Sequence, residues 1–345
     1  MVRKPLGTLA LSLFLSPYFI FLIYFLSMHF TIDVASFLQN FSVIGWDAQF
    51  HIAKTSQILG LPVPDSFVNI KNIDTYPSLT HYSLAIINLV SGLSVKVVLN
   101  FVVIILAFLG LPLAIGLLAY SSRKSVDSAF YSAAFFLTVF SVTSYIGYQS
   151  LLPQVTVLVA ATLFVALFNL HKYKALPALV FVIVNSHRYA LMYFVPVILF
   201  VVLQAWREKR RRSLPYLAIS LLMLPSFVIF NSNLVVDMSA VVPSSIQLLK
   251  PLENLRIILF EATTSFLLDS PNLLVVLGLG LTFCFFLAGL AVGLLYSPGL
   301  LLFLTFFPFL FYFVDPNARV LIHSIPFFSV IAGSGFDRIK KFLIK

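Results

Sequence analysis

A short stretch near the N-terminus places acid–base side chains at helical spacing. Residues 45–54 read Gly-Trp-Asp-Ala-Gln-Phe-His-Ile-Ala-Lys, and a helix there would put Asp47 and His51 one turn apart on one face. A carboxylate in this position can take a proton from a hydroxyl group. The same two side chains can also bind a divalent metal ion. A solvated Asp–His pair without a chemical role is the third interpretation.

Two further groups of polar side chains border apolar segments. Tyr76 opens the sequence Tyr-Pro-Ser-Leu-Thr-His-Tyr, in which Pro77 suits the first turn of a helix that carries His81. His187 and Arg188 stand between two closely spaced apolar segments, where an arginine is suited to bidentate contact with a phosphate. The alternatives are a hydrogen bond between helices for His81 and unspecific contact of Arg188 with lipid headgroups.

A third group lies near the C-terminus. Asp315 and Arg319 enclose the sequence Pro-Asn-Ala, and His323 follows one helical turn later. A cation and a histidine so close together suit an anionic ligand, whereas an ion pair between Asp315 and Arg319 is the simpler interpretation.

The elements that carry these residues have the composition of a membrane protein. Hydrophobic residues make up 60% of the 345 residues, charged residues only 10%, and the mean hydropathy is +1.03. The remaining polar side chains are too few to cover a soluble fold of this size. This excludes a soluble enzyme, a nucleic-acid-binding protein and a disordered chain. The single Cys284 excludes a disulfide framework and a cysteine-based metal site.

The apolar segments predict an all-α integral membrane protein with about ten transmembrane helices. The expected spans are residues 8–29, 96–119, 128–146, 152–170, 175–186, 189–206, 214–230, 273–296, 299–314 and 320–336. No internal repeat and no paired half-repeats are evident, so we expect residues 1–345 to form one membrane domain.

The distribution of basic residues predicts the orientation. If residues 78–92 form an interfacial helix that does not cross the membrane, all five basic clusters face the cytoplasm, as the positive-inside rule requires. Both termini are then cytoplasmic, and the polar segments 31–77 and 231–271 lie outside, together with most histidines. We therefore expect a multi-pass protein, in the plasma membrane, whose active face is extracytoplasmic.

In this order, the segments resemble the GT-C superfamily of membrane glycosyltransferases, which includes protein mannosyltransferases and aminoarabinose transferases. The resemblance rests on one span followed by a long outer loop with an aspartate, here GWDAQFHIAKTSQILGLP. It rests also on the pattern Tyr-Pro-x-Leu-x-His, here YPSLTHYSLAIINLVSGLS, and on a basic residue before a proline-containing span, here NSHRYALMYFVPVILFVVL. The similarity is best over residues 1–206 and is architectural thereafter, apart from DPNAR.

The resemblance implies an inverting glycosyltransferase with a polyprenyl-phosphate-linked sugar as donor. Asp47 would be the base that activates the acceptor, and His51 would join it in the catalytic group. The implied substrate-binding residues are Tyr76, His81, His187, Arg188, Asp315, Arg319 and His323. Many members carry a second acid where this chain reads Gly-Tyr-Gln-Ser at 147–150, so the cofactor stays undetermined, with a divalent metal ion at Asp47 and His51 as one option.

Two other functions fit the same sequence. One is a transporter or flippase for a lipid-linked or other anionic substrate, which would place polar residues at mid-membrane depth. The other is a non-catalytic membrane subunit that binds a partner or lipid. We expect membrane lipid as a partner and no nucleic acid, whereas the sugar and the acceptor leave no pattern in the sequence.

Overall fold

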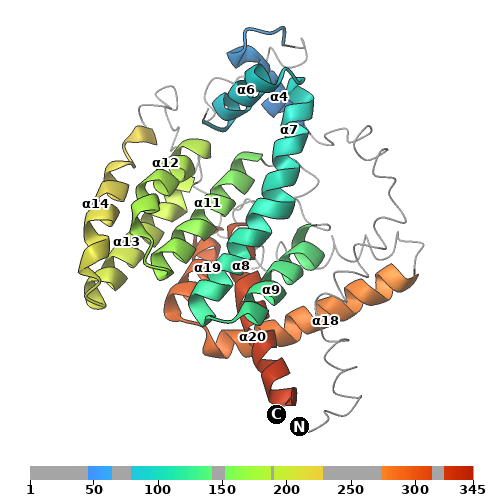
Figure 1. Ribbon diagram of the computed structural model, residues 1–345, viewed down its shortest axis with the longest axis vertical. Coiled ribbons are helices and arrows are strands. Elements are labelled where there is room, and N and C mark those ends of the chain that lie inside the picture. Colours follow the sequence, from blue (N-terminus) through green and yellow to red (C-terminus); the bar gives the residue numbers. More distant parts are fainter. Residues whose placement is uncertain are drawn as a thin grey trace, which may run out of the picture.

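The computed structural model describes residues 46–63, 79–141, 152–187, 190–227, 273–312 and 322–344. These residues form helices and contain no strand, which confirms the all-α fold class for this part of the chain. In Figure 1 the short helices α4 (Trp46–Ile58) and α6 (Leu79–Ser91) lie at one end of the bundle, and the C-terminus of α20 (Ile325–Ile344) lies at the other.

Most helices occur where the apolar segments predict them, although α20 begins five residues and ends eight residues later than the expected span 320–336. The expected interfacial helix 78–92 corresponds to α6, and residues 95–123 form α7 (Val95–Ile104), a π-helical turn (Ile105–Gly110) and α8 (Leu111–Arg123). The others are α9 (Val126–Phe135) with a second π-helical turn (Phe136–Ser141), α11 (Leu152–Asn169), α12 (Leu176–Ser186), α13 (Ala190–Arg207), α14 (Leu214–Leu222), α18 (Leu273–Tyr296) and α19 (Gly299–Tyr312). The expected span 8–29 and the outer segment 231–271 lie outside the described residues.

Few of these helices are long enough to cross a membrane alone. By length and apolar composition, one helix within the described ranges qualifies, Val95–Arg123. A second candidate is the pair Leu281–Tyr296 and Gly299–Leu310, whose axes are bent by 117° at their junction. The core helix of a soluble protein meets the same criterion, so the count of ten transmembrane helices stays a prediction.

Close helix packing at the C-terminus depends on small residues. Gly289 and Gly293 lie one turn apart on α18, and a Cβ atom at either would collide with the backbone of α20 at Ala332 or Ile331. The backbones of the two helices therefore touch where no side chain separates them. Small residues four positions apart are typical of helix contacts in membranes, where close van der Waals packing replaces the hydrophobic effect.

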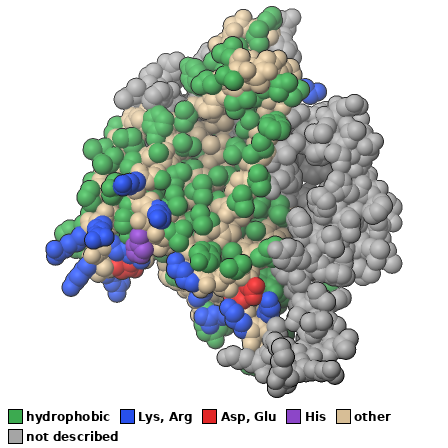
Figure 2. Space-filling model, viewed as in Figure 1, with side chains coloured by type: hydrophobic (Ala, Val, Ile, Leu, Met, Phe, Trp, Pro, Cys, Tyr) green, Lys and Arg blue, Asp and Glu red, His purple; other side chains and the backbone are tan. Residues whose placement is uncertain are grey.

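The basic clusters gather at one end of the bundle, where Figure 2 shows most of the Lys and Arg side chains. Asn169 Nδ2, at the end of α11, donates to Ser122 Oγ near the end of α8, at 3.4 Å. Lys340 Nζ, near the end of α20, donates to Asp127 Oδ2 in the first turn of α9, at 2.9 Å. Four of the five clusters, at residues 123–124, 172–174, 207–212 and 338–341, are thereby brought to one side; the cluster at residues 3–4 lies outside the described residues.

The helices α11 to α14 form two consecutive units with the same backbone structure. Each unit has a helix of 18 residues, a left-handed residue (His171 and Lys209, with φ of 60° and 55°), a 3₁₀ turn (Tyr173–Ala175 and Arg211–Ser213) and a helix that begins Leu-Pro. Each feature of the second unit follows its counterpart in the first unit by the same number of residues. No repeat was evident in the sequence because the units share helix length and turn geometry and, apart from Leu-Pro, little residue identity.

Candidate functional site

Two buried histidines join α4 to α6 at the end of the bundle opposite the basic clusters. Nδ1 of His51 lies 3.0 Å from Nε2 of His81, although the two residues are 30 positions apart. The ring centroids are 5.1 Å apart and the ring planes meet at 42°. Only 3% of His51 and none of His81 is exposed. The structure thus brings together the histidines of the two N-terminal motifs.

Local packing fixes both rings. Thr55, one turn after His51, donates from Oγ1 to the carbonyl oxygen of His51 at 2.8 Å, and the ring of Phe50 meets that of His51 edge to face at 5.6 Å. On α6, the buried residues Leu84 and Ala85 follow His81 by three and four positions and therefore share its face. Each histidine therefore lies among buried residues of its own helix.

The contact limits the charge that the pair can hold. In the hydrogen bond one ring nitrogen donates its proton and the facing nitrogen accepts it, so at least one of the two rings is neutral. Two imidazolium rings would bring two N–H groups face to face. The pair therefore holds at most one positive charge while it is intact, and it can take up or release a single proton.

A buried cation lies on the same helix. Lys54 follows His51 by three positions in α4 and is only 6% exposed. A buried ammonium group needs partners that offset the cost of removing it from water. Lys54 thus adds a buried basic side chain to the helix that carries His51.

The helix α6 also packs against α11 and α12, which contribute buried polar side chains at their adjoining ends. Asn185, near the end of α12, donates from Nδ2 to Ser226 Oγ at 2.8 Å, and His187 is buried directly after the helix. Gln154, in the first turn of α11, is 1% exposed, and neither its amide nitrogen nor its amide oxygen has a hydrogen-bond partner among the described residues. Such an amide costs free energy unless a ligand satisfies it.

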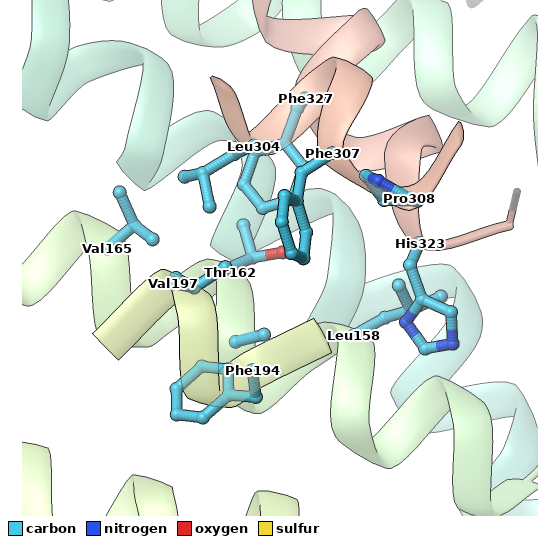
Figure 3. Close-up of a pocket in the computed structure, with 11 residues that line it drawn as sticks. Leu158, Thr162, Val165, Phe194, Val197, Leu304, Phe307, Pro308, His323 and Phe327 are labelled. Carbon is cyan, nitrogen blue, oxygen red and sulfur yellow. The ribbon is translucent and has the colours of Figure 1, made fainter. Parts of the chain in front are cut away.

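His323 occupies a different environment. It lines a narrow apolar pocket between α11, α13, α19 and the start of α20, together with Leu158, Thr162 and Pro308 (Figure 3). The pocket has a volume of about 30 Å³, which is room for roughly two water molecules. A sugar does not fit in this pocket. His323 therefore lies in a separate, apolar environment and not beside the histidine pair.

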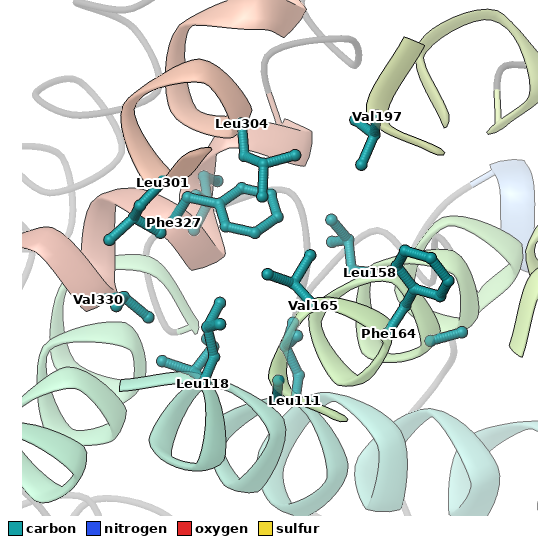
Figure 4. Close-up of a cluster of buried hydrophobic side chains, with 14 of the residues drawn as sticks. Leu111, Leu118, Leu158, Phe164, Val165, Val197, Leu301, Leu304, Phe327 and Val330 are labelled. Carbon is teal, nitrogen blue, oxygen red and sulfur yellow. The ribbon is translucent and has the colours of Figure 1, made fainter. Parts of the chain in front are cut away.

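This pocket is a gap in the hydrophobic core. Figure 4 shows the buried cluster in which Leu158, Val165 and Val197 meet Leu304 and Phe327, and all five side chains also line the pocket. The polar end near α4 and α6 is consequently the better candidate for chemistry.

Several expected site residues lie outside the described part of the chain. Asp47 belongs to α4, one turn before His51, but its side chain is not among those described. The other site predictions outside the described residues are Tyr76, Arg188, Asp315 and Arg319. Within the described residues, no group of three or more His, Cys, Asp or Glu side chains is placed to hold a metal ion. The metal option at Asp47 and His51 stays a prediction.

A hydrogen bond from His81 to another helix was one of the interpretations of the sequence, and the structure shows such a bond. The partner, His51, was not predicted, because the contact depends on how α4 packs on α6, which no local pattern encodes. The sequence analysis also missed Gln154. Gln154 had a usable signal, because it is the first strongly polar side chain in an otherwise apolar segment.

Comparisons of this chain with protein families, with characterised proteins and with solved structures give no match. The functional assignment therefore depends on the residues and their geometry.

Proposed function

We propose that this chain is an integral membrane glycosyltransferase of the GT-C type. It transfers a sugar from a polyprenyl-phosphate-linked donor to an acceptor at the extracytoplasmic face, with both termini in the cytoplasm. The observation that carries the proposal is the 3.0 Å contact between His51 and His81, because it joins two of the motifs on which the resemblance rests. The contact lies at the end of the bundle opposite the basic clusters.

The outer surface of the helices supports the membrane location. Large apolar side chains are exposed along several helices, among them Leu89, Val90, Phe101, Leu113, Leu203, Leu222 and Leu310. Contiguous apolar surface of this extent is rare on soluble monomers and is expected where lipid surrounds a protein. The basic clusters at one end of the same helices match the distribution that the positive-inside rule predicts.

The proposed chemistry is a single displacement at the anomeric carbon. The bond from this carbon to the phosphate oxygen breaks, and its electron pair stays on the phosphate. The acceptor oxygen forms the new bond from the opposite side and gives its proton to Asp47, so the configuration inverts. His51, one turn along α4, takes the proton from Asp47 and shares it with His81, which readies the carboxylate for another cycle.

The leaving phosphate needs positive charge that is fixed in advance. Lys54 lies three residues after His51 on the same helix, and we assign it, with Arg188 and Arg319, to the donor phosphate. Gln154 and His187 would contact the sugar or the acceptor. Tyr76, Asp315 and His323 remain expected substrate contacts, with His323 the least favoured because of its apolar surroundings.

The transporter or flippase remains the alternative. The repeat of α11–α12 in α13–α14 gives it some support, since repeated units are common in transporters. The described histidines of the site, however, lie at the end of the bundle and not at its middle. A non-catalytic subunit would keep the histidine pair for structural reasons only.

The experiment is sugar transfer from a radiolabelled polyprenyl-phosphate sugar to a membrane extract by purified protein. The wild type should transfer label, and Asp47→Asn should lose at least about 100-fold of the rate, the usual contribution of a general base. Asp127→Asn, at the basic end, is the matched control and should keep full activity. Wild-type protein that binds the donor without transferring it would favour the transporter or the subunit.

A further inference from the structure

The two equivalent turns of the repeat lie side by side and form one basic surface. Arg210 Nη1, in the second turn, donates to the carbonyl oxygen of Phe168 at the first turn, at 3.5 Å, and its guanidinium lies 4.9 Å from the centroid of the Phe168 ring. Arg210 also pairs with Glu208 at 2.5 Å. Arg210 therefore ties the turns together, and Glu208 is the single acid in residues 168–175 and 207–213.

The remaining basic residues of the turns point their charge to the outside. They are exposed on both turns, and two of them, Lys174 and Arg212, occupy matching positions; the others are Lys172, Arg207, Lys209 and Arg211. The charge of Glu208 is already engaged by Arg210 and by Gln204 Nε2, which donates to it at 2.8 Å. The surface consequently carries a dense positive charge with no acid of its own left to balance it.

An exposed apolar face leads up to this charge. On α13, Leu199, Leu203 and Trp206 are spaced by four and three residues, so they share one face, and Leu203 and Trp206 are 67% and 74% exposed. Ile219 and Leu222 are exposed on the neighbouring α14. Figure 2 shows apolar side chains next to the basic ones on this side of the molecule. The occupant must therefore be amphipathic, with an anionic head and an apolar body.

We propose that the paired turns, residues 168–175 and 207–213, together with the apolar face of α13, form a binding site for an anionic phospholipid. The phosphate of the headgroup lies between the two turns, where Arg211 and Arg212 donate to it. The acyl chains lie along Leu199 and Leu203. Trp206 stands at the boundary, as tryptophan does at membrane interfaces. A soluble acidic protein or a nucleic acid would leave the apolar face uncovered.

This site is separate from the proposed reaction. It depends on the membrane location but not on glycosyl transfer, because it lies at the end of the bundle away from His51 and His81. Lipid bound there would fasten the two units of the repeat to each other and to one leaflet.

The test is the binding of fluorescent phosphatidylglycerol and phosphatidylcholine to the purified full-length protein in neutral detergent. The wild type should bind phosphatidylglycerol at least about ten-fold more tightly, as expected for several basic side chains near one anionic headgroup, and added salt should reduce the preference. The triple variant Lys209→Gly, Arg211→Ser, Arg212→Ser should lower the preference to about two-fold or less. An unchanged preference, or none in the wild type, would overturn the site.

The left-handed residues supply a matched control that spares the fold. Lys209 and Lys124 both have a positive φ, of 55° and 54°, and both are exposed, so replacement by glycine relieves backbone strain at either position. Lys209→Gly should weaken phosphatidylglycerol binding by about five-fold, the worth of one base near a charged surface, whereas Lys124→Gly should leave it unchanged. Equal losses in the two variants would mean unspecific attraction by the whole basic end and would contradict the proposal. Selective lipid binding without sugar transfer would support this site and contradict the proposed glycosyltransferase function. Sugar transfer without selective lipid binding would support that function and contradict this site.

Discussion

His51 and His81 face each other through different ring nitrogens, Nδ1 of the first and Nε2 of the second, at 3.0 Å in a buried contact. The hydrogen bond needs one neutral ring and uses one nitrogen of each ring. The pair thus links α4 to α6 and gives the site one exchangeable proton. Its geometry supports both a structural and a catalytic role, and the two roles predict different effects of mutation.

The structural role predicts energetic coupling between the two histidines. Replacing either ring by alanine leaves the facing nitrogen buried without its partner, which costs about 1–3 kcal/mol in the free energy of unfolding. His51→Ala with His81→Ala should cost less than the two single changes added together, by about 1 kcal/mol. Thermal unfolding of the four proteins in one detergent measures this coupling. Strict additivity would show that the contact contributes nothing to stability.

The buried amide of Gln154 predicts that its replacement by an apolar side chain raises stability and lowers activity. Its amide is buried, and neither of its polar atoms is hydrogen-bonded to the described residues. Gln154→Leu removes this penalty and should raise the free energy of unfolding by about 1–2 kcal/mol, while sugar transfer falls because the ligand loses its contact. Gln204→Leu, which breaks a hydrogen bond to Glu208 at the basic end, is the control for activity and should keep the wild-type rate of transfer. A Gln154→Leu protein that is less stable would mean that its amide is satisfied within the protein.

The contact between α18 and α20 predicts a steric effect at one glycine. Alanine at Gly293 would place its Cβ atom against the Ile331 carbonyl group, which is backbone and cannot move aside like a flexible side chain. The helices must separate, at a cost of about 1–3 kcal/mol. Alanine at Gly299, which faces open space, should have little effect. Melting temperatures in detergent compare the two variants, and similar values would argue against the close packing.

The raised pKa of Lys340 predicts that its contribution to stability is lost at alkaline pH. Burial by itself would lower the pKa of Lys340, but the hydrogen bond to Asp127 and the nearby Tyr131 outweigh it and raise the pKa above the ordinary lysine value. A raised pKa in the folded state means that the stabilisation is complete below the unfolded-state pKa, about 10.4, and is lost as the pH rises through the folded-state value.

The melting temperature of the wild type should therefore exceed that of Lys340→Ala by a constant small margin at neutral pH. The margin should shrink above about pH 10.4, and because the pair is partly exposed it corresponds to less than about 1 kcal/mol. Lys96→Ala serves as the control, because Lys96 lies at the start of α7, at the end of the bundle opposite Lys340 (Figure 1). A margin that grows with pH would contradict the assigned shift.

The sequence was informative about helices and less so about contacts. The length of the apolar runs predicted α6, α11, α12 and α13 to within one or two residues. A long apolar run bounded by basic or proline residues is compatible with few structures other than a helix of that length. The repeat in α11–α14 was not predicted, because turn geometry was kept while side chains changed, as at His171 and Lys209.

The site was predicted in part for a similar reason. The family resemblance implied that His51 and His81 belong to one site, and the structure brings them into contact. Their hydrogen bond and the burial of Gln154 depend on tertiary packing between helices, which no spacing within one segment reveals.

The most direct test of the account is the rate of sugar transfer by His51→Gln, His81→Gln and the double variant, each checked for folding and donor binding. His171→Gln, at the basic end, is the control. If the pair relays the acceptor proton, each single change should lower the rate by about 100-fold, with donor binding retained, and the double change should lower it no further. Wild-type rates in the single variants would contradict a catalytic role for the pair and leave it as a structural contact.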